Sequence, residues 1–380
     1  MPKMRILHVF RAPVGGLFRH VVDVAKGQSE RGHDVGIFCD ASTGGSRAAQ
    51  ALEALRPHLR LGITRMPMWR LPHPMDALAL LRLTNHVRSL RPDVLHGHGS
   101  KGGAYARMVT APGLGTKTVR AYTPHGGSFN YNPGTTSHAI YMTAEKVLTR
   151  RTDVFLFESA YVKGRFEAFV GETDKLVRVV HNGIAEAEFA PIERGADPFD
   201  LVYIGEFRIA KGVDTLIDAL AIIRREHGMR LTLLAVGAGP SEGDLKSRAQ
   251  EAGVWDSIAF VPPQNIRGAL SRGRIMVVPS KAESLPYVVL EAAAAAQPLI
   301  CTNVGGIGEI FGPHSGELIA PGDPAGLAAK ILASLREPED RLRAKAAELA
   351  AFVRSGFRIE RMVDGVLDGY AEARARRGLT

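Results

Sequence analysis

Residues 275–296 have the sequence IMVVPSKAESLPYVVLEAAAAA, and this stretch decides the fold. The apolar, β-branched run Ile275–Val278 predicts a buried strand, and Leu285–Ala296 predicts a helix that follows after a short turn. Pro286 suits the first turn of this helix, because the N–H that proline lacks would have no partner there. A strand that leads directly into a helix is the repeating unit of a parallel sheet with crossover helices.

Two glutamates in this stretch are candidate binding residues. Glu283 lies just before the predicted helix, and Glu291 lies inside it on a face that is otherwise apolar, with Val288, Ala292 and Ala295. A carboxylate among such residues is costly to bury unless it has hydrogen-bond partners. The vicinal hydroxyls of a ribose would provide these partners. The alternative, a simple charge on the helix surface, does not account for the pair of glutamates.

The alternation of strands and helices extends over the whole chain. In the first half it predicts strands at Arg5–Phe10, Asp34–Asp40, Asp93–His96, Lys117–Tyr122, Asp153–Phe157 and Val177–Val180, and helices at Phe18–Arg31, Met75–Leu90 and Thr136–Arg150. In the second half it predicts further strands at Leu201–Ile204, Leu231–Val236, Ile258–Val261, Leu299–Thr302 and Gly316–Ile319, and helices at Val213–Glu226, Gly243–Ala252 and Ala325–Leu335. The last stretch, Arg336–Arg377, is predominantly helical in pattern.

The length indicates two domains, because 380 residues exceed one core of ordinary size. Residues 187–199 (AEFAPIERGADPF) contain two prolines, a glycine and mixed charges without periodicity. We therefore predict Rossmann-like domains at 1–187 and 200–357, a linker at 188–199 and a final helical segment at 358–380. In open parallel sheets the ligand lies beyond the carboxyl ends of the strands, here in a cleft between the two domains.

Two cations lie at the start of a predicted helix in the second half. Arg208 and Lys211 belong to the segment GEFRIAKG at 205–212. A guanidinium, an ammonium and the unpaired N–H groups of a helix start can converge there on a diphosphate. A solvated surface is the alternative, but the helix dipole alone disfavours cations at this end.

A glycine pair follows the first predicted strand. Gly15 and Gly16 allow close approach of the backbone to a phosphate at the start of the next helix, although a tight turn alone would also use them. The full G-x-G-x-x-G fingerprint is absent, which argues against an enzyme that uses NAD.

Histidines mark three places in the first half. His96 and His98 resemble metal ligands in their spacing, but no third ligand of the right type lies near them in the sequence, so we predict no metal site. We expect one of the two to be packed and the other to face the cleft. His125, in TPHGG, follows a strand and is placed to contact a substrate, unless its role is purely structural. His20 lies in the helix after the glycine pair.

The net charge of +9 is confined to one half of the chain. Residues 1–190 contain 25 Lys and Arg against 15 Asp and Glu, whereas residues 191–380 contain 23 against 24. A basic first half favours contact with an anionic membrane surface or a phosphorylated acceptor. The basic residues are not interleaved with aromatic ones, which argues against nucleic acid as a partner. A merely well-solvated surface remains an alternative.

Several classes of protein are disfavoured by what the sequence lacks. No apolar run approaches the ~20 residues of a membrane span, and the start of the chain predicts a strand in place of a secretion signal. Cys39 and Cys301 are expected to be buried free thiols in a reducing cytoplasm. No D-x-D element stands at a strand end to hold a diphosphate through Mg²⁺.

Taken together, these segments resemble the retaining GT-B glycosyltransferases of the group-1, or family 4, class. The segments that carry the resemblance are GGLFRH, DVLHGHGSKGG, TPHGG, VVHNGI, GEFRIAKGVDTLIDAL, AVGAGP, PSKAESLPYVVLEAAAA and NVGGIGEI, in that order. The two glutamates with their flanking PS and LEA are the most specific element. The resemblance covers essentially the whole chain and implies two Rossmann-like domains whose parallel sheets face a cleft, with the C-terminal helix crossing back to the first domain.

The resemblance also implies roles for individual residues. The diphosphate of the donor would be held by Arg208 and Lys211, its ribose by Glu291 and its sugar by Glu283. Further donor contacts would come from Gly15, Gly16, Val261, Ser284 and Leu285.

On the other side of the cleft, His125 would lie against the reacting centre, and His20 and His98 would line the acceptor side. No metal and no cofactor are implied, since the nucleotide-sugar is itself a substrate.

Two positions depart from the family pattern. Many members have arginine directly after the glycine where this chain has Glu206, so the phosphate role passes to Arg208. The strand that usually ends F-x-G near the base reads Phe260-Val261-Pro262-Pro263 here, and each proline removes a backbone donor.

The implied activity is the transfer of a hexose-type sugar from a UDP-sugar, or next a GDP-sugar, to a glycan or lipid-linked acceptor. The expected setting is cell-surface polysaccharide or glycolipid biosynthesis in the cytoplasm, with peripheral contact to an anionic membrane. The alternatives are a nucleotide-sugar epimerase or phosphorylase on the same scaffold, and a non-catalytic subunit that binds nucleotide-sugars.

Overall fold

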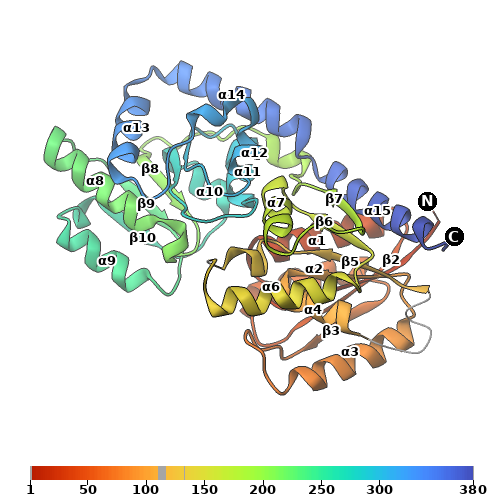
Figure 1. The fold of residues 1–380 in the computed structure, drawn as a ribbon. Coiled ribbons are helices and arrows are strands. Elements are labelled where there is room, and N and C mark those ends of the chain that lie inside the picture. The colour runs from red at the N-terminus through yellow and green to blue at the C-terminus, as the bar shows by residue number, and fades with distance from the viewer. Residues whose placement is uncertain (1, 110–116, 132, 380) are drawn as a thin grey trace. The chain divides into compact units, whose positions relative to one another are not determined.

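The structure is a computed structural model that describes residues 2–109, 117–131 and 133–379. The chain forms two compact units. The first unit consists of Met1–Gly183 together with Ile359–Thr380, and the second is Ile184–Arg358. Figure 1 shows the first unit from red to yellow-green with the last helix in dark blue, and the second unit from green to blue.

The first unit is built on a seven-stranded sheet in which every neighbouring pair of strands is parallel. The order is β3-β2-β1-β4-β5-β6-β7, so the sheet grows in one direction from β1 and in the opposite direction from β4. The strands are β1 (Arg5–Phe10), β2 (Asp34–Asp40), β3 (Gly62–Met66), β4 (Val94–His98), β5 (Val119–Thr123), β6 (Val154–Phe157) and β7 (Leu176–Val179). This order contains the Rossmann arrangement with one added strand.

Helices join these strands and cover the sheet (Figure 1). They are α1 (Gly15–Glu30), α2 (Gly45–Leu55), α3 (Asp76–Leu90), α4 (Gly99–Met108), α6 (Thr136–Thr149), α7 (Ala160–Phe169) and α15 (Ile359–Arg376). The sequence did not predict α2, α4, α7 or β3. The glycines of α4 let this helix pack tightly on the sheet, since a Cβ on Gly102 would lie 2.4 Å from the carbonyl oxygen of Val9.

The C-terminal helix α15 completes the core of the first unit. Its buried residues Val363, Val366 and Tyr370 join strand residues of β1, β4, β5, β6 and β7 in one apolar cluster. The approach to α1 is close, since a Cβ on Gly27 would lie 2.6 Å from a methyl group of Val363. A helix from the end of the chain is therefore part of the first unit's fold.

The second unit has a five-stranded parallel sheet in the order β10-β9-β8-β11-β12. Its strands are β8 (Phe199–Ile204), β9 (Leu233–Val236), β10 (Ile258–Val261), β11 (Gly273–Val278) and β12 (Leu299–Cys301). Its helices are α8 (Val213–His227), α9 (Glu242–Glu251), α10 (Ile266–Leu270), α11 (Tyr287–Ala294), α12 (Ile307–Phe311), α13 (Pro324–Arg336) and α14 (Glu339–Gly356). Two apolar clusters, one on each face, bury this sheet.

Two expectations for the second unit need correction. Gly316–Ile319 is not a strand: a 3-10 helix occupies Gly312–Glu317, and Ile319 forms only an isolated bridge with Thr302. Residues 188–199, predicted as a linker, lie inside the second unit, where Phe189 is buried. They are held there because the N–H of Ile192 donates to the carbonyl of Ala295 at 3.0 Å.

Candidate functional site

In the second unit, sheet order brings together two segments far apart in the sequence. The order of the strands reverses between the neighbours β8 and β11, and parallel α/β sheets bind their ligands beyond the carboxyl ends of the strands at such a reversal point. The loop after β8 is Gly205–Gly212, and the loop after β11 begins at Pro279. Both contain predicted site residues.

Lys211 and Glu283 meet at this reversal point. The Nζ of Lys211 lies 2.7 Å from Oε1 of Glu283, and the hydroxyl of Ser280 donates to the same carboxylate oxygen at 2.7 Å. Glu283 is only 8% exposed, whereas the lysine side chain is partly exposed. The buried carboxylate is therefore satisfied by one charge and one hydroxyl, and the ammonium lies where solvent or a ligand can reach it.

Two glycines allow the loops to approach this closely. Gly212 has a φ of +68°, and a Cβ there would lie 1.9 Å from the carbonyl oxygen of Pro279. Gly305, with a φ of +59°, would place a Cβ 2.2 Å from the carbonyl oxygen of Glu283. Side chains at either position would push the Glu283 segment away. The loops are further joined because the N–H of Lys281 donates to the carbonyl of Ala210 at 2.8 Å.

Arg208 lies on the same loop but is oriented differently from Lys211. Its guanidinium is 3.5 Å from a carboxylate oxygen of Glu206, and its side chain is 45% exposed. Arg208 thus directly precedes the short 3-10 helix Ile209–Lys211, which leads into α8, and Lys211 is its last residue. Glu206, the residue that departs from the family pattern, is the ion-pair partner of Arg208.

The remaining candidate donor-binding residues lie on other loops, strands and helices of the second unit. Glu291 lies in α11 and is partly buried, Leu285 is buried in the apolar core, and the carbonyl of Ser284 accepts from Gly306 at 2.6 Å. Val261 ends β10, and its carbonyl accepts from Gly237 at 2.9 Å. Leu285 thus packs in the core and could reach a ligand only through its backbone.

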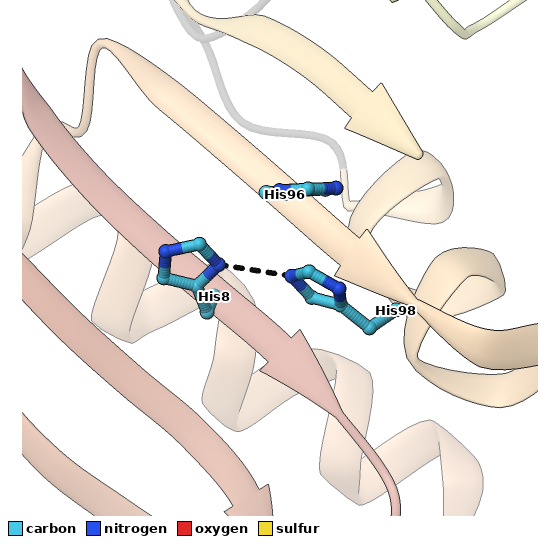
Figure 2. Close-up of side chains that lie close together, drawn as sticks. All are labelled: His8, His96 and His98. Carbon is cyan, nitrogen blue, oxygen red and sulfur yellow. Dashed lines mark hydrogen bonds between the residues drawn. The ribbon is translucent and has the colours of Figure 1, made fainter. Parts of the chain in front are cut away.

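The first unit carries a second group of candidate residues at its own reversal point, between β1 and β4. His8 of β1 is paired in register with His96 of β4, and Phe10 with His98. Figure 2 shows the three imidazoles gathered over these two strands, with a hydrogen bond between Nδ1 of His8 and Nε2 of His98 at 2.9 Å. His20 of α1 and His125 after β5 complete the cluster.

This histidine cluster (His8, His20, His96, His98 and His125) is buried except at His125, which is partly buried. Burial lowers the pKa of His8 and of His20 to about 4, and it lowers the pKa of the other three well below 6.5. All five imidazoles are therefore neutral at pH 7. Neutral rings can both donate and accept hydrogen bonds, and they can bind a metal.

Two expectations for the histidines need correction. His96 and His98 do not face different environments: both are fully buried, because residues two apart on a strand point to the same face. We also expected no third ligand near His96 and His98, but the fold places His8 beside them. It also places His98 beside His20 and His125. In each trio, one ring nitrogen from each histidine lies within 4.8 Å of those of the other two.

The glycine pair begins α1. Gly15 has a φ of +64°, and both Gly15 and Gly16 are exposed at the helix start, which has no acidic residue in its first turn. The amides of this first turn are thus not opposed by a carboxylate of their own helix. This geometry is compatible with an anion but does not by itself define a site.

The sequence did not point to four residues that form hydrogen bonds within one or the other of these two groups. These are Ser280 beside Glu283, and His8, Gln28 and Tyr370 beside the other histidines. Ser280 could have been found, because it is three residues before Glu283 in the same loop. Gln28 and Tyr370 could not, since they come from helices whose pairing only the fold decides.

Two Rossmann-like units, each built on a parallel sheet, are the architecture of the GT-B glycosyltransferases. The profile of the family described as glycosyl transferases group 1 matches residues 185–349, and that of glycosyltransferase family 4 matches residues 14–188. Glycogen synthase of Mycobacterium tuberculosis (strain H37Rv) is 31% identical over 351 residues, which cover 86% of this chain and 83% of that protein. The chain belongs to the group-1, family 4 glycosyltransferases.

Other relatives extend this assignment. D-inositol 3-phosphate glycosyltransferase of Acidothermus cellulolyticus is 27% identical over 398 residues, which cover 96% of this chain and 87% of that protein. Among solved structures, sucrose-phosphate synthase from Thermosynechococcus elongatus has a TM-score of 0.78 at 19% identity and covers 98% of this chain and 100% of its own. HepE of Anabaena in complex with UDP-glucose has a TM-score of 0.77 at 16% identity, with 97% and 100% covered. The two structures show the shared GT-B fold.

Two further observations concern membrane-spanning helices and the cysteines. No helix among the described residues is long and apolar enough to cross a lipid bilayer. Cys39 and Cys301 are both free and buried, as predicted. Burial raises the pKa of the Cys39 thiol to about 12, so this thiol is unreactive at neutral pH.

Proposed function

We propose that this glycosyltransferase moves a hexose-type sugar from a nucleotide-diphospho-sugar, with UDP-sugars favoured and GDP-sugars next, to a glycan or lipid-linked acceptor. Retention of configuration and independence of metal are part of the proposal, as is a role in cell-surface polysaccharide or glycolipid biosynthesis. The name of the relative from Mycobacterium tuberculosis, a glycogen synthase, supports a glycan acceptor. The complex of HepE with UDP-glucose supports a UDP-sugar as donor.

The observation that carries the proposal is the junction of Lys211, Ser280 and Glu283 where the strand order of the second unit reverses. A partly exposed ammonium held beside a buried carboxylate provides a positive charge for a diphosphate and an acceptor for sugar hydroxyls at one place. Arg208, on the same loop, adds a guanidinium whose side chain is 45% exposed. Glu291 of α11 would accept from the ribose hydroxyls.

The chemistry follows from these charges. Departure of the nucleoside diphosphate places negative charge on the leaving oxygen, and preorganised cations stabilise that charge more in a site that excludes water than in bulk solvent. Lys211 and Arg208 would carry this role in place of a metal. In the first unit, His125 with Gly15 and Gly16 would act on the substrates, and His20 and His98, which are buried against His125, would support it on the acceptor side.

Titration calorimetry tests the donor directly. UDP-, GDP- and ADP-sugars are titrated into the protein with and without EDTA, followed by a transfer assay with glycan and lipid-linked acceptors. We expect the tightest binding for a UDP-sugar, unchanged by EDTA, and transfer only when an acceptor is present. Loss of binding in EDTA would refute metal independence, and epimerisation of the donor alone would favour the rival enzyme class.

Peripheral membrane contact is a further part of the proposal. In the basic first unit, Trp69, Leu71 and Met75 are apolar side chains exposed by 43%, 64% and 41%, and the first two flank Arg70. Aromatic and basic residues side by side are typical of contact with an anionic lipid surface. We expect flotation with anionic vesicles at low salt that W69A/L71A weakens. Equal recovery with neutral and anionic vesicles would contradict this part.

A further inference from the structure

A chain of hydrogen bonds leads from the C-terminal helix to His125. The amide nitrogen of Gln28 donates to the hydroxyl of Tyr370 at 3.4 Å, and the amide oxygen of Gln28 lies 2.8 Å from Nε2 of His8. Nδ1 of His8 lies 2.9 Å from Nε2 of His98, and Nδ1 of His98 lies 3.1 Å from Nε2 of His125. The four residues before His125 are all fully buried. Water therefore does not reach these side chains, and their hydrogen-bond partners come from the protein.

The chemistry of Gln28 fixes the direction of this chain. Its amide oxygen can only accept, so the ring hydrogen of His8 must be on Nε2. A neutral imidazole has one N–H, and burial keeps these rings neutral. Nδ1 of His8 is therefore bare and accepts from Nε2–H of His98. By the same reasoning, Nδ1 of His98 is bare and accepts from Nε2–H of His125.

We propose that Gln28 is a positioning residue that sets the tautomer of His125 through His8 and His98. His125 then has its hydrogen on Nε2 and a bare lone pair on Nδ1. In the structure the ring of His125 makes its hydrogen bond to His98 through Nε2, at 3.1 Å. In the substrate complex His125 consequently accepts a hydrogen bond from a hydroxyl of a sugar substrate, and it neither donates from Nδ1 nor carries a positive charge. The assignment of that hydroxyl to a sugar depends on the proposed function.

The backbone supports this orientation of His125. The residue has a φ of +54°, a left-handed conformation that few residues other than glycine adopt. Its N–H donates to the carboxylate of Glu158 at 3.1 Å. Strained backbone of this kind persists where the surrounding structure requires a particular side-chain direction.

The neighbouring His20 favours the same tautomer. Its Nδ1 donates to the amide oxygen of Asn182 at 3.0 Å, which leaves its Nε2 bare, and this buried nitrogen has no partner among the described residues. The rings of His20 and His125 are 4.7 Å apart and meet edge to face. A buried bare nitrogen is better placed beside an N–H than beside a second bare nitrogen.

A second branch of the network provides a matched control. The hydroxyl of Tyr370 accepts from Gln28, so it donates to Nδ1 of His96 at 2.6 Å, and Nε2–H of His96 donates to Thr123 at 2.9 Å. This branch ends at Thr123 and does not reach the ring of His125. T123V thus removes one partner from a buried imidazole, as Q28L does, without interrupting the path to His125.

The test is two-bond ¹H–¹⁵N correlation NMR on protein labelled in its histidine rings, with EDTA present and His125 assigned from H125N. The wild-type protein is expected to show His125 with its hydrogen on Nε2 alone. In Q28L, His8 loses its acceptor, and His125 is expected to change to the Nδ1–H form or to a mixture of both. In T123V, it should stay as in the wild type.

Two outcomes would overturn the proposal. The first is a wild-type His125 that is protonated on both nitrogens or on Nδ1 alone, a result that needs no variant to fold. The second is a folded Q28L protein whose His125 tautomer is unchanged. An activity measurement distinguishes failure of this proposal from failure of the proposed function. We expect kcat/KM of Q28L to fall about tenfold, the equivalent of one hydrogen bond. A wild-type protein with the expected tautomer but no transferase activity would refute the function and leave the tautomer assignment intact.

Discussion

At the scale of single residues, Lys211 and Lys281 form a matched pair. Both follow strands that end at the same reversal point, and each has one carboxylate partner, Glu283 for Lys211 at 2.7 Å and Asp214 for Lys281 at 2.5 Å. Only Glu283 is buried, so only Lys211 is fixed at a site that a donor diphosphate would use. The two lysines therefore differ in the burial of their carboxylate partners and not in their own chemistry.

We predict that K211A lowers kcat/KM by about a hundredfold or more, which corresponds to about 2.7–4 kcal/mol of transition-state stabilisation. K281A removes a partly exposed ion pair, which is worth about 1 kcal/mol or less, and should keep most of the activity. Steady-state kinetics with the best donor from calorimetry measures both. Similar losses in the two variants would show that Lys211 has no special role.

At the scale of elements, the shape of the donor loops depends on where glycine stands. Gly212 lies between the short 3-10 helix and α8, with a positive φ and no room for a Cβ beside Pro279. Gly243 lies in α9, where an added Cβ would meet no atom within 4 Å. Substituting these two glycines in parallel therefore distinguishes an effect on the loops of the site from an effect of glycine on helix propensity.

G212A is predicted to reduce both stability and activity, because either the Pro279 loop must move or the left-handed backbone is lost. G243A should instead raise the free energy of unfolding by about 0.5–1 kcal/mol, because alanine favours the helix. Thermal unfolding and transfer assays on both variants measure this contrast. An active, fully stable G212A would mean that the two loops are not held as closely as the structure shows.

At the scale of the whole molecule, acid stability should differ between the two units. Burial lowers the pKa of His8 and of His20 from 6.5 to about 4. Between these values the unfolded chain binds a proton at each histidine and the folded first unit does not. Stability is thus complete above about pH 6.5 and falls as the pH decreases toward 4, by about 1.4 kcal/mol per pH unit for each histidine.

Hydrogen exchange read by mass spectrometry measures this difference, because it resolves the two units within one molecule. Protection of the strands β1 and β4 should decrease between pH 7 and 5 after correction for intrinsic exchange. Protection of β8 and β11, whose unit lacks such a histidine cluster among its described residues, should change less. Equal losses in both units would contradict the assignment of the effect to the histidines.

Much of the candidate site follows from local pattern. The strand ends that carry Arg208, Lys211 and Glu283 are visible in the sequence, since apolar runs followed by glycine and proline mark the carboxyl ends of strands. The strands Arg5–Phe10 and Asp34–Asp40 were predicted with the bounds that they have in the structure. By contrast, β3 has only partly buried side chains over most of its length, so it carried no apolar run to find.

By itself, the sequence determined that this protein alternates strands and helices in two Rossmann-like units and that its candidate donor residues stand at strand ends, because both depend on residues close together in the chain. Only the tertiary structure decided that Lys211 and Glu283 meet, since that depends on β8 lying beside β11. The same holds for the path from Tyr370 to His125. A helix from the end of the chain must first pack on the first sheet before any hydrogen bond along that path can form.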